Sequence, residues 1–222
     1  MTALAPRQID LLFAALIGAG LLCVVLIVGL WFVNLVNFMD GLDLVTVAEV
    51  VPITATMILL GWLGEFPAFS SIVAAALCGA MLGFAPFNRP VAKVFLGDVG
   101  SLPVGLLLGW CLLQLAWRQH LAAALLLPLY YLLDATVTLL RRMVRHEKFW
   151  TAHRTHFYQR ATENGFTVPR IVAEILVLNV ILAALAVASI GLNSVTADIL
   201  SLLAGAIVTA LTLYRFSRSR SA

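Results

Sequence analysis

Charged residues are scarce in this sequence. Asp, Glu, Lys and Arg make up 11% of its 222 residues, whereas soluble domains usually carry about a quarter. Hydrophobic residues make up 62%, and the mean hydropathy is +1.02. A water-soluble fold of this length could not bury so many apolar side chains. The composition therefore excludes an ordinary soluble domain or a nucleic-acid-binding protein, and predicts that lipid surrounds most of the chain.

Cysteine is also rare, and the start of the chain lacks the cations of a cleavable signal. Cys23, Cys78 and Cys111 are dispersed through apolar runs, a pattern that offers neither a disulfide framework nor metal-ligand spacing. Arg7 is the only early cation, and the apolar stretch 11–33 is longer than the hydrophobic core of a signal peptide. This stretch predicts a first spanning helix.

Long apolar runs dominate the rest of the sequence. A helix needs about 20 apolar residues to span the hydrocarbon, and backbone polar groups in lipid must be satisfied within the segment. The sequence predicts an all-α integral membrane protein with one domain, 1–222, and about seven spans. These lie near 11–33, 44–63, 66–87, 100–117, 121–140, 171–190 and 195–214. The second is the weakest, because it contains Glu49 and Pro52.

The distribution of Lys and Arg predicts the orientation. If the segment 34–43 is cytoplasmic, that side holds twelve cations and the other side only Arg7 and Arg118. By the positive-inside rule the N-terminus is outside and the C-terminus inside. The twelve are Arg89, Lys93, Arg141, Arg142, Arg145, Lys148, Arg154, Arg160, Arg170, Arg215, Arg218 and Arg220.

The first predicted inner loop carries oxygen-bearing side chains at three-residue spacing. They are Asn34, Asn37, Asp40 and Asp43. On a helical turn this spacing forms one polar stripe at the membrane edge. Carboxylate and amide oxygens suit Mg²⁺ and phosphate-bearing substrates. The structural alternative is that Asp40-Gly41 is a turn and that Asp43 caps the second helix.

The second inner loop, Lys93–Ser101, places Asp98 between two glycines at the entry to the fourth helix. Glycine lets the backbone approach a ligand, and helix N-termini favour anions. A carboxylate here can hold a cation that in turn holds a phosphate; an ordinary capped helix start is the alternative. Ser101, Gly105 and Gly109 recur every four residues, which predicts close approach of another helix.

The third inner loop, Arg141–Arg160, is dense in Arg and His. Arginine binds phosphate bidentately, and histidine can shuttle protons near neutral pH. An anchor at lipid headgroups explains Arg141, Arg142 and Arg145, but explains less well the cluster of His153, Arg154, His156 and Arg160.

Asp134 is a separate candidate, because carboxylates inside a membrane usually mark function or a polar partner. It lies seven residues before Arg141, about 10 Å deep at helical rise. Pairing with an arginine is the structural alternative.

Three motifs now stand in order: N-x-x-N-F-M-D-G-x-D, F-L-G-D-x-G-S and H-R-x-H-x-Y-Q-R. They resemble the polyprenyl-phosphate N-acetylhexosamine-1-phosphate transferases, bacterial glycosyltransferase family 4 enzymes that start O-antigen, teichoic-acid and related glycans and are similar to the peptidoglycan translocase. The resemblance runs from about residue 33 to 170, and the Y-Q-R ending is more similar to the O-antigen type.

The resemblance implies a reaction and a site. Undecaprenyl phosphate would attack the β-phosphate of a UDP-N-acetylhexosamine, giving polyprenyl-diphospho-sugar and UMP on the cytoplasmic face of the bacterial inner membrane. The cofactor would be Mg²⁺, with Mn²⁺ as the alternative, and a homodimer is left open. By resemblance, the metal ligands would be Asp98 and Asp40; the catalytic residues Asp98, Asp40, Asp43 and His156; and the substrate-binding residues Asn34, Asn37, His153, Arg154 and Arg160.

Two other functional classes compete with this interpretation. The family has an earlier loop with paired aspartates, whereas this sequence contains no Asp-Asp pair and is expected to be the C-terminal two-thirds of the family fold. That difference favours a non-catalytic protein that binds the lipid or a partner. A transporter with a proton site at Asp134 would need polar residues spread through several helices, and here they crowd into loops.

Overall fold

The computed structural model describes residues 6–147 and 155–219. These residues form nine helices and no strand, which confirms the predicted all-α class. The helices are α1 (Pro6–Met39), α2 (Val45–Trp62), α3 (Ala68–Phe84), α4 (Gly97–Trp117), α5 (Leu121–Leu126), α6 (Leu129–Val144), α7 (Phe157–Glu163), α8 (Val168–Leu192) and α9 (Val195–Phe216).

The predicted count of seven spans is not supported. Five of the described helices, α1, α2, α4, α8 and α9, are long and apolar enough to cross a membrane. A sixth, α3, is apolar but only 17 residues long. The predicted span 121–140 is wrong as a continuous helix. It is divided between α5 and α6 at Leu127 and Pro128, because proline lacks an N–H and its ring clashes with the preceding turn.

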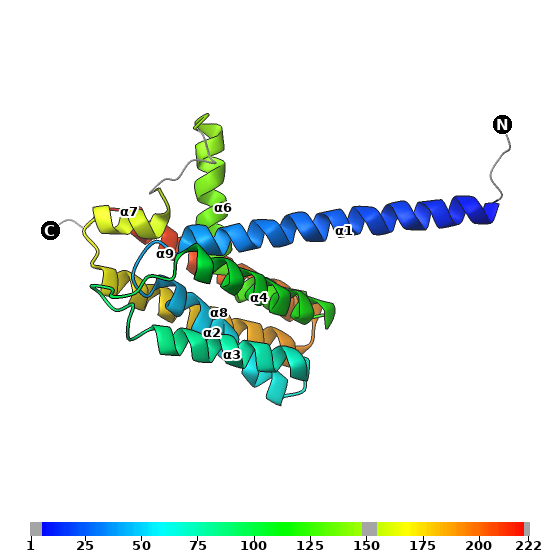
Figure 1. Cartoon of the computed structure of the whole chain (residues 1–222), viewed down its shortest axis with the longest axis horizontal. Coiled ribbons are helices and arrows are strands. Elements are labelled where there is room, and N and C mark those ends of the chain that lie inside the picture. The colour runs from blue at the N-terminus through cyan, green and yellow to red at the C-terminus, as the bar shows by residue number, and fades with distance from the viewer. Residues whose placement is uncertain (1–5, 148–154, 220–222) are drawn as a thin grey trace.

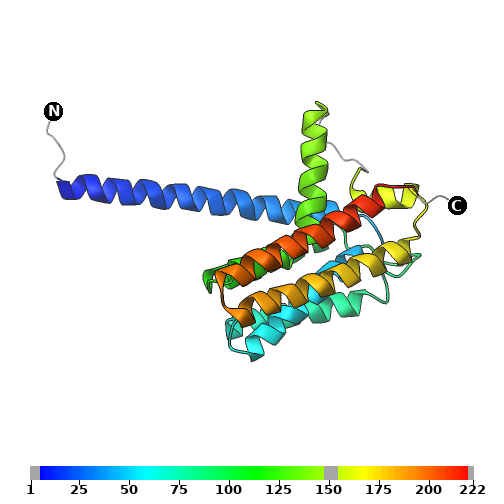
Figure 2. The same cartoon turned by 180° about the vertical axis from the view of Figure 1, so that it is seen from behind.

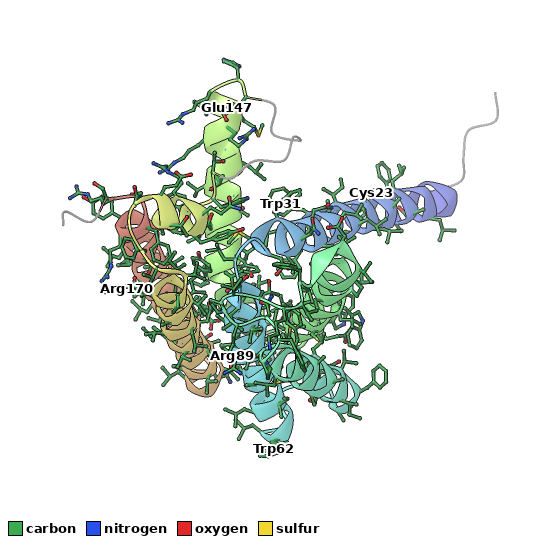
Figure 3. The ribbon with its side chains drawn as sticks, turned by 60° about the vertical axis from the view of Figure 1, so that its left-hand side comes forward. Cys23, Trp31, Trp62, Arg89, Glu147 and Arg170 are labelled. Carbon is green, nitrogen blue, oxygen red and sulfur yellow. The ribbon has the colours of Figure 1, made fainter. Side chains whose placement is uncertain are left out.

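Most of the apolar helices lie alongside one another in a bundle, and two helices depart from it (Figures 1 and 2). The C-terminal part of α1 packs on the bundle while its N-terminal half projects beyond it. The α6 helix leaves the bundle sideways. Figure 3 marks the two projections with Cys23 on α1 and Glu147 just beyond the tip of α6.

The contact between α1 and α4 confirms the predicted close approach along the small-residue stripe. A Cβ atom added to Gly105 would lie 3.0 Å from the Cα atom of Val33, and one added to Gly109 would lie 2.9 Å from the Phe32 ring. Phe32, Leu35 and Val36 on α1 are buried. Small residues on α4 therefore let the two backbones meet closely, as in other membrane helix pairs.

The predicted inner loops meet at one end of the bundle. We call this the loop end; it comprises residues 37–44, residues 85–101 and residues 156–164. The α1 and α2 helices join there, as do α3 and α4, and the last turn of α9 contacts α7 through the Asn164 amide, which donates to the Phe216 carbonyl at 2.7 Å. The opposite end holds a His120–Glu65 contact of 3.1 Å. That the loop end is cytoplasmic stays a prediction.

One polar pair is buried in the bundle between α2 and α8. The side chains of Glu49 and Asn179 are 0% and 1% exposed, and the Asn179 amide donates to Glu49 Oε2 at 2.6 Å and to the Ala48 carbonyl at 3.0 Å. Asn179 is remote in sequence from the predicted site motifs, whereas Glu49 follows Asp43 by six residues. Buried polar groups within a membrane bundle usually find partners on neighbouring helices, as these two do.

Candidate active site

The first and second predicted loops are joined through Asn37. Its amide, in the last turn of α1, donates to Asp98 Oδ1 at 2.9 Å and to the Ser101 hydroxyl at 2.8 Å. Asp98 and Ser101 lie in the first two turns of α4, which begins at Gly97 with a φ of 60°. The Asp98 side chain is exposed and Ser101 is buried. The close packing of α1 on α4 thus brings an amide and an accessible carboxylate together.

Asp40 lies in the turn between α1 and α2, where it is held by a relay of hydroxyl groups. The Thr46 hydroxyl donates to Asp40 Oδ1 at 2.5 Å, and the Tyr131 hydroxyl donates to Thr46 Oγ1 at 3.4 Å. Burial raises the pKa of the Asp40 carboxyl above its ordinary value, while the bond from Thr46 partly lowers it. Burial disfavours the charged form of a carboxyl, and a donor to the carboxylate favours it.

Asp43 and Asn88 tie the first loop to the second. Asp43 Oδ2 accepts the Ala92 main-chain N–H at 3.2 Å. The Asn88 side chain accepts the Leu44 N–H at 2.7 Å and donates to the Val94 carbonyl at 2.9 Å. Leu44 has a φ of 65° at the start of α2. Asn88 is buried, and it satisfies one main-chain group from each of the two loops. It therefore fixes the position of the two loops relative to each other.

The third loop packs directly on the first. The Tyr158 hydroxyl, on α7, donates to the Phe38 carbonyl at 3.2 Å. A Cβ atom on Gly41 would collide with the Tyr158 hydroxyl and would lie 2.8 Å from Gln159 Nε2. Only glycine fits Gly41 at this separation. Burial raises the pKa of the Tyr158 hydroxyl, so it stays a neutral donor.

Asp134 and His156 meet in the interior behind this contact. His156 Nδ1 lies 3.2 Å from Asp134 Oδ1, and the two side chains are 2% and 0% exposed. Pairing of Asp134 with an arginine is not what the described residues show. The predicted depth of about 10 Å for Asp134 stays a prediction. It assumed one continuous helix over 121–140, whereas α6 is separate from α5 and leaves the bundle sideways (Figure 1).

The predicted polar stripe on the first loop is wrong. The α1 helix ends at Met39, so helical spacing does not continue to Asp40 and Asp43. Asn34 donates to the Leu30 carbonyl of its own helix at 2.8 Å instead of joining the cluster. Asp43 is not a cap either, since Leu44 takes the N-cap position of α2 without a side-chain cap. Near Asp98, Leu96 holds the equivalent position of α4, also without a side-chain cap.

Two predicted substrate-binding residues, His153 and Arg154, lie outside the described residues. Arg160 is described: it is half-buried in the last turn of α7. Of the nine predicted site residues, the structure thus places six, Asn37, Asp40, Asp43, Asp98, His156 and Arg160, on elements of the loop end. Their roles stay predictions.

The donor set is suited to a metal that arrives with a phosphate substrate. Among residues 6–147 and 155–219, no three His, Cys, Asp or Glu side chains gather closely enough to hold a metal by themselves. Mg²⁺ usually keeps several waters and uses one or two carboxylates together with substrate phosphates. The exposed Asp98 carboxylate, with one oxygen held by Asn37, fits that mode.

Comparison with known proteins bears directly on this arrangement. The family model described as glycosyl transferase family 4 matches residues 4–116, half of the chain, including the Asn37, Asp40, Asp43 and Asp98 segments. The chain belongs to glycosyl transferase family 4. The family 4 match ends within α4, before α7 and the third loop.

Several curated relatives of this family 4 chain carry the name phospho-N-acetylmuramoyl-pentapeptide-transferase. That of Streptococcus thermophilus (strain CNRZ 1066) is 39% identical over 119 residues, which cover 52% of this chain and 34% of the relative. That of Rhodopseudomonas palustris (strain BisB18) is 29% identical over 168 residues, 68% of this chain and 45% of the relative. The chain therefore spans between about a third and a half of the length of these relatives.

The sequence motifs missed several residues that build this family 4 site. Thr46 and Tyr131 lie inside apolar runs, and Asn88 follows a helix end without any motif. Ser101 ends the F-L-G-D-x-G-S motif and also carried a packing signal, and Tyr158 was part of the third motif, but neither had an assigned role. The only sign of Thr46 and Tyr131 in the sequence is that each is a polar side chain within an apolar run. That sign does not show which residue each one bonds.

Proposed function

We propose that this protein transfers an N-acetylhexosamine 1-phosphate from a UDP-sugar to undecaprenyl phosphate at the cytoplasmic face of the bacterial inner membrane, and so starts a cell-surface glycan such as O-antigen. An oxygen of the lipid phosphate would form a bond to the β-phosphorus of the donor. The bond from that phosphorus to the oxygen of the α-phosphate would break, and UMP would leave. The juxtaposition of Asn37, Asp98 and Ser101 at the loop end is the observation that carries the proposal.

The residues of the loop end divide into acidic and basic groups. Asp98, oriented by Asn37, and Asp40, oriented by Thr46, would hold Mg²⁺. Bound there, the metal would supply neutralisation of the diphosphate charge, the main requirement of phosphoryl transfer. Arg160, with the predicted residues His153 and Arg154, would bind the diphosphate or the sugar, because guanidinium groups match phosphate geometry.

The test is transfer of radiolabelled sugar phosphate from UDP-N-acetylglucosamine to undecaprenyl phosphate by the purified chain. Asp98→Asn should abolish transfer, because it removes the accessible carboxylate, and omission of Mg²⁺ should do the same. Arg118→Gln, at the opposite end of the bundle, is the control that should keep wild-type activity. Normal transfer by Asp98→Asn would refute the metal role, and an inactive wild-type chain would refute the function.

The relatives support a second donor. Each is named for a phospho-N-acetylmuramoyl-pentapeptide group, so the same assay should be run with UDP-N-acetylmuramoyl-pentapeptide. Faster transfer from that donor would replace the proposed sugar without changing the reaction. The Y-Q-R sequence at residues 158–160 of α7 favours the smaller donor by its resemblance to the O-antigen type.

A further inference from the structure

The carboxylate of Asp134 sits where three parts of the molecule meet. It lies on α6, is 0% exposed, and none of the proposed catalytic steps uses it. Its own helix supplies two donors, the Tyr130 hydroxyl at 3.3 Å and the Thr138 hydroxyl at 3.3 Å. A buried carboxylate needs several donors to remain in place, so the identity of its other partners shows what it holds.

The other donors among the described residues come from the start of α7 and the residue before it. The main-chain N–H groups of Phe157 and Tyr158 donate to the two carboxylate oxygens at 3.0 and 3.2 Å. His156 Nδ1 is 3.2 Å from the first oxygen. A carboxylate only accepts, so this bond fixes the hydrogen of the imidazole on Nδ1. The Arg141 guanidinium lies 4.6 Å from the centre of the Phe157 ring, a second tie between α6 and α7.

The same turn of α7 reaches the first loop. The His156 ring stacks on the Tyr158 ring with centroids 5.8 Å apart, and the Tyr158 hydroxyl bonds the Phe38 carbonyl. Phe38 directly follows Asn37, the residue that holds Asp98. A continuous set of contacts therefore runs from Asp134 through α7 to the proposed site.

We infer that Asp134 is a positioning residue for the transfer reaction. It fixes the His156 imidazole and the start of α7, and thereby fixes the position of the third loop relative to the first. This inference rests on the proposed function. It differs from a transporter role, in which the carboxylate itself would carry the proton, and from a plain structural role, in which its loss would lower stability without acting through His156.

The first measurement does not depend on activity. Hydrogen exchange of the peptide that contains Phe157 and Tyr158 is compared in the purified full chain and in Asp134→Asn. Exchange should be faster by about tenfold or more, because bonds to a charged acceptor are lost. Asp198→Asn is the matched control: it makes the same change at the start of α9, where the carboxylate accepts from the Ser189 hydroxyl at the opposite end of the bundle, and exchange of α7 should stay as in the wild type. Unchanged exchange in Asp134→Asn overturns the inference.

The second measurement is a double-mutant cycle in the transfer assay. Asp134→Asn and His156→Gln should each lower kcat by about 10–100-fold, the effect typical of a partner that orients a functional histidine, with KM for the UDP-sugar changed by less than about threefold. Combined, they should lose no more than the worse single variant, because Asp134 acts through His156. Multiplied losses overturn the inference.

Two further outcomes stay separate. If the wild-type chain shows no transfer, the proposed function fails and the exchange experiment still decides whether Asp134 anchors α7. If Asp134→Asn does not fold, Asp134→Glu replaces it, because the longer side chain keeps the charge and displaces both oxygens. Asp134→Glu should show faster exchange and lower kcat; wild-type values for both would overturn the inference.

Discussion

Two opposing effects of the structure act on the protonation of the Asp40 carboxyl in the site. Burial raises its pKa, and the Thr46 hydroxyl works against that increase by donating to the carboxylate. Thr46 is in turn held by Tyr131. The balance between burial and a single hydroxyl donor thus sets the pH range over which Asp40 is ionised.

Thr46→Val should therefore raise the pKa of Asp40 further. A function that needs the ionised carboxylate is complete above that pKa and is lost as the pH falls through it, so the acidic limb of the transfer rate should move to higher pH. Thr46→Ser keeps the donor and should match the wild type. The pKa itself is measured by infrared absorption of the protonated carboxyl, assigned with Asp40→Asn. An acidic limb that does not move in Thr46→Val would contradict this prediction.

The contact between α1 and α4 decides the site geometry at the scale of elements. Asn37 and Asp98 lie on these two helices, and both backbones approach closely at Gly105. Gly105→Leu should force the helices apart and destabilise the protein by about 1–3 kcal/mol, as overpacking does. Transfer should fall as well, because the Asn37–Asp98 bond spans the same interface.

The matched control for that change is Gly83→Leu on α3, where a Cβ atom would meet nothing within 4 Å. It should leave both stability and transfer near the wild-type level. Stability is measured by denaturant unfolding in detergent, followed by circular dichroism. Equal losses in the two variants would show that bulk in the lipid-facing helices, and not the α1–α4 contact, is responsible.

Sequence predicted some elements of this fold and not others, for physical reasons. Lipid requires long apolar helices, so α1, α4, α8 and α9 could be located from composition. The break before α6 could not, because averaging over an apolar run hides Pro128. The stripe at Ser101, Gly105 and Gly109 predicted a packing face but could not name α1 as its partner. Pairing of Asp134 with the start of α7 depends on the path of α6, which no local pattern specifies.

The whole molecule gathers the three loops at one end, and this is the part of the sequence hypothesis that geometry supports best. Asn37 touches Asp98, and Tyr158 touches Phe38.

The side of the membrane on which the loop end lies is a separate prediction. Two single-cysteine variants test it, Arg89→Cys and Gln119→Cys, because these positions lie at opposite ends of the bundle. In both variants the native residues Cys23, Cys78 and Cys111 are replaced by alanine.

Those cysteines should react differently in intact cells. An impermeant maleimide should label the Gln119 position from outside, and the Arg89 position only after the membrane is opened. The expected direction follows from the excess of Lys and Arg at the loop end. Labelling of the Arg89 position in intact cells would reverse the topology, and labelling of both positions would contradict a transmembrane arrangement of the bundle.

The free half of α1 has an energetic consequence of its own. The large apolar side chains that the structure describes between Leu11 and Leu30 are 44–67% exposed. In water, each would forgo on the order of 1 kcal/mol of transfer free energy. Together they make desorption from the bilayer unfavourable by on the order of 10 kcal/mol, a penalty that alone would keep spontaneous escape into the aqueous phase negligible.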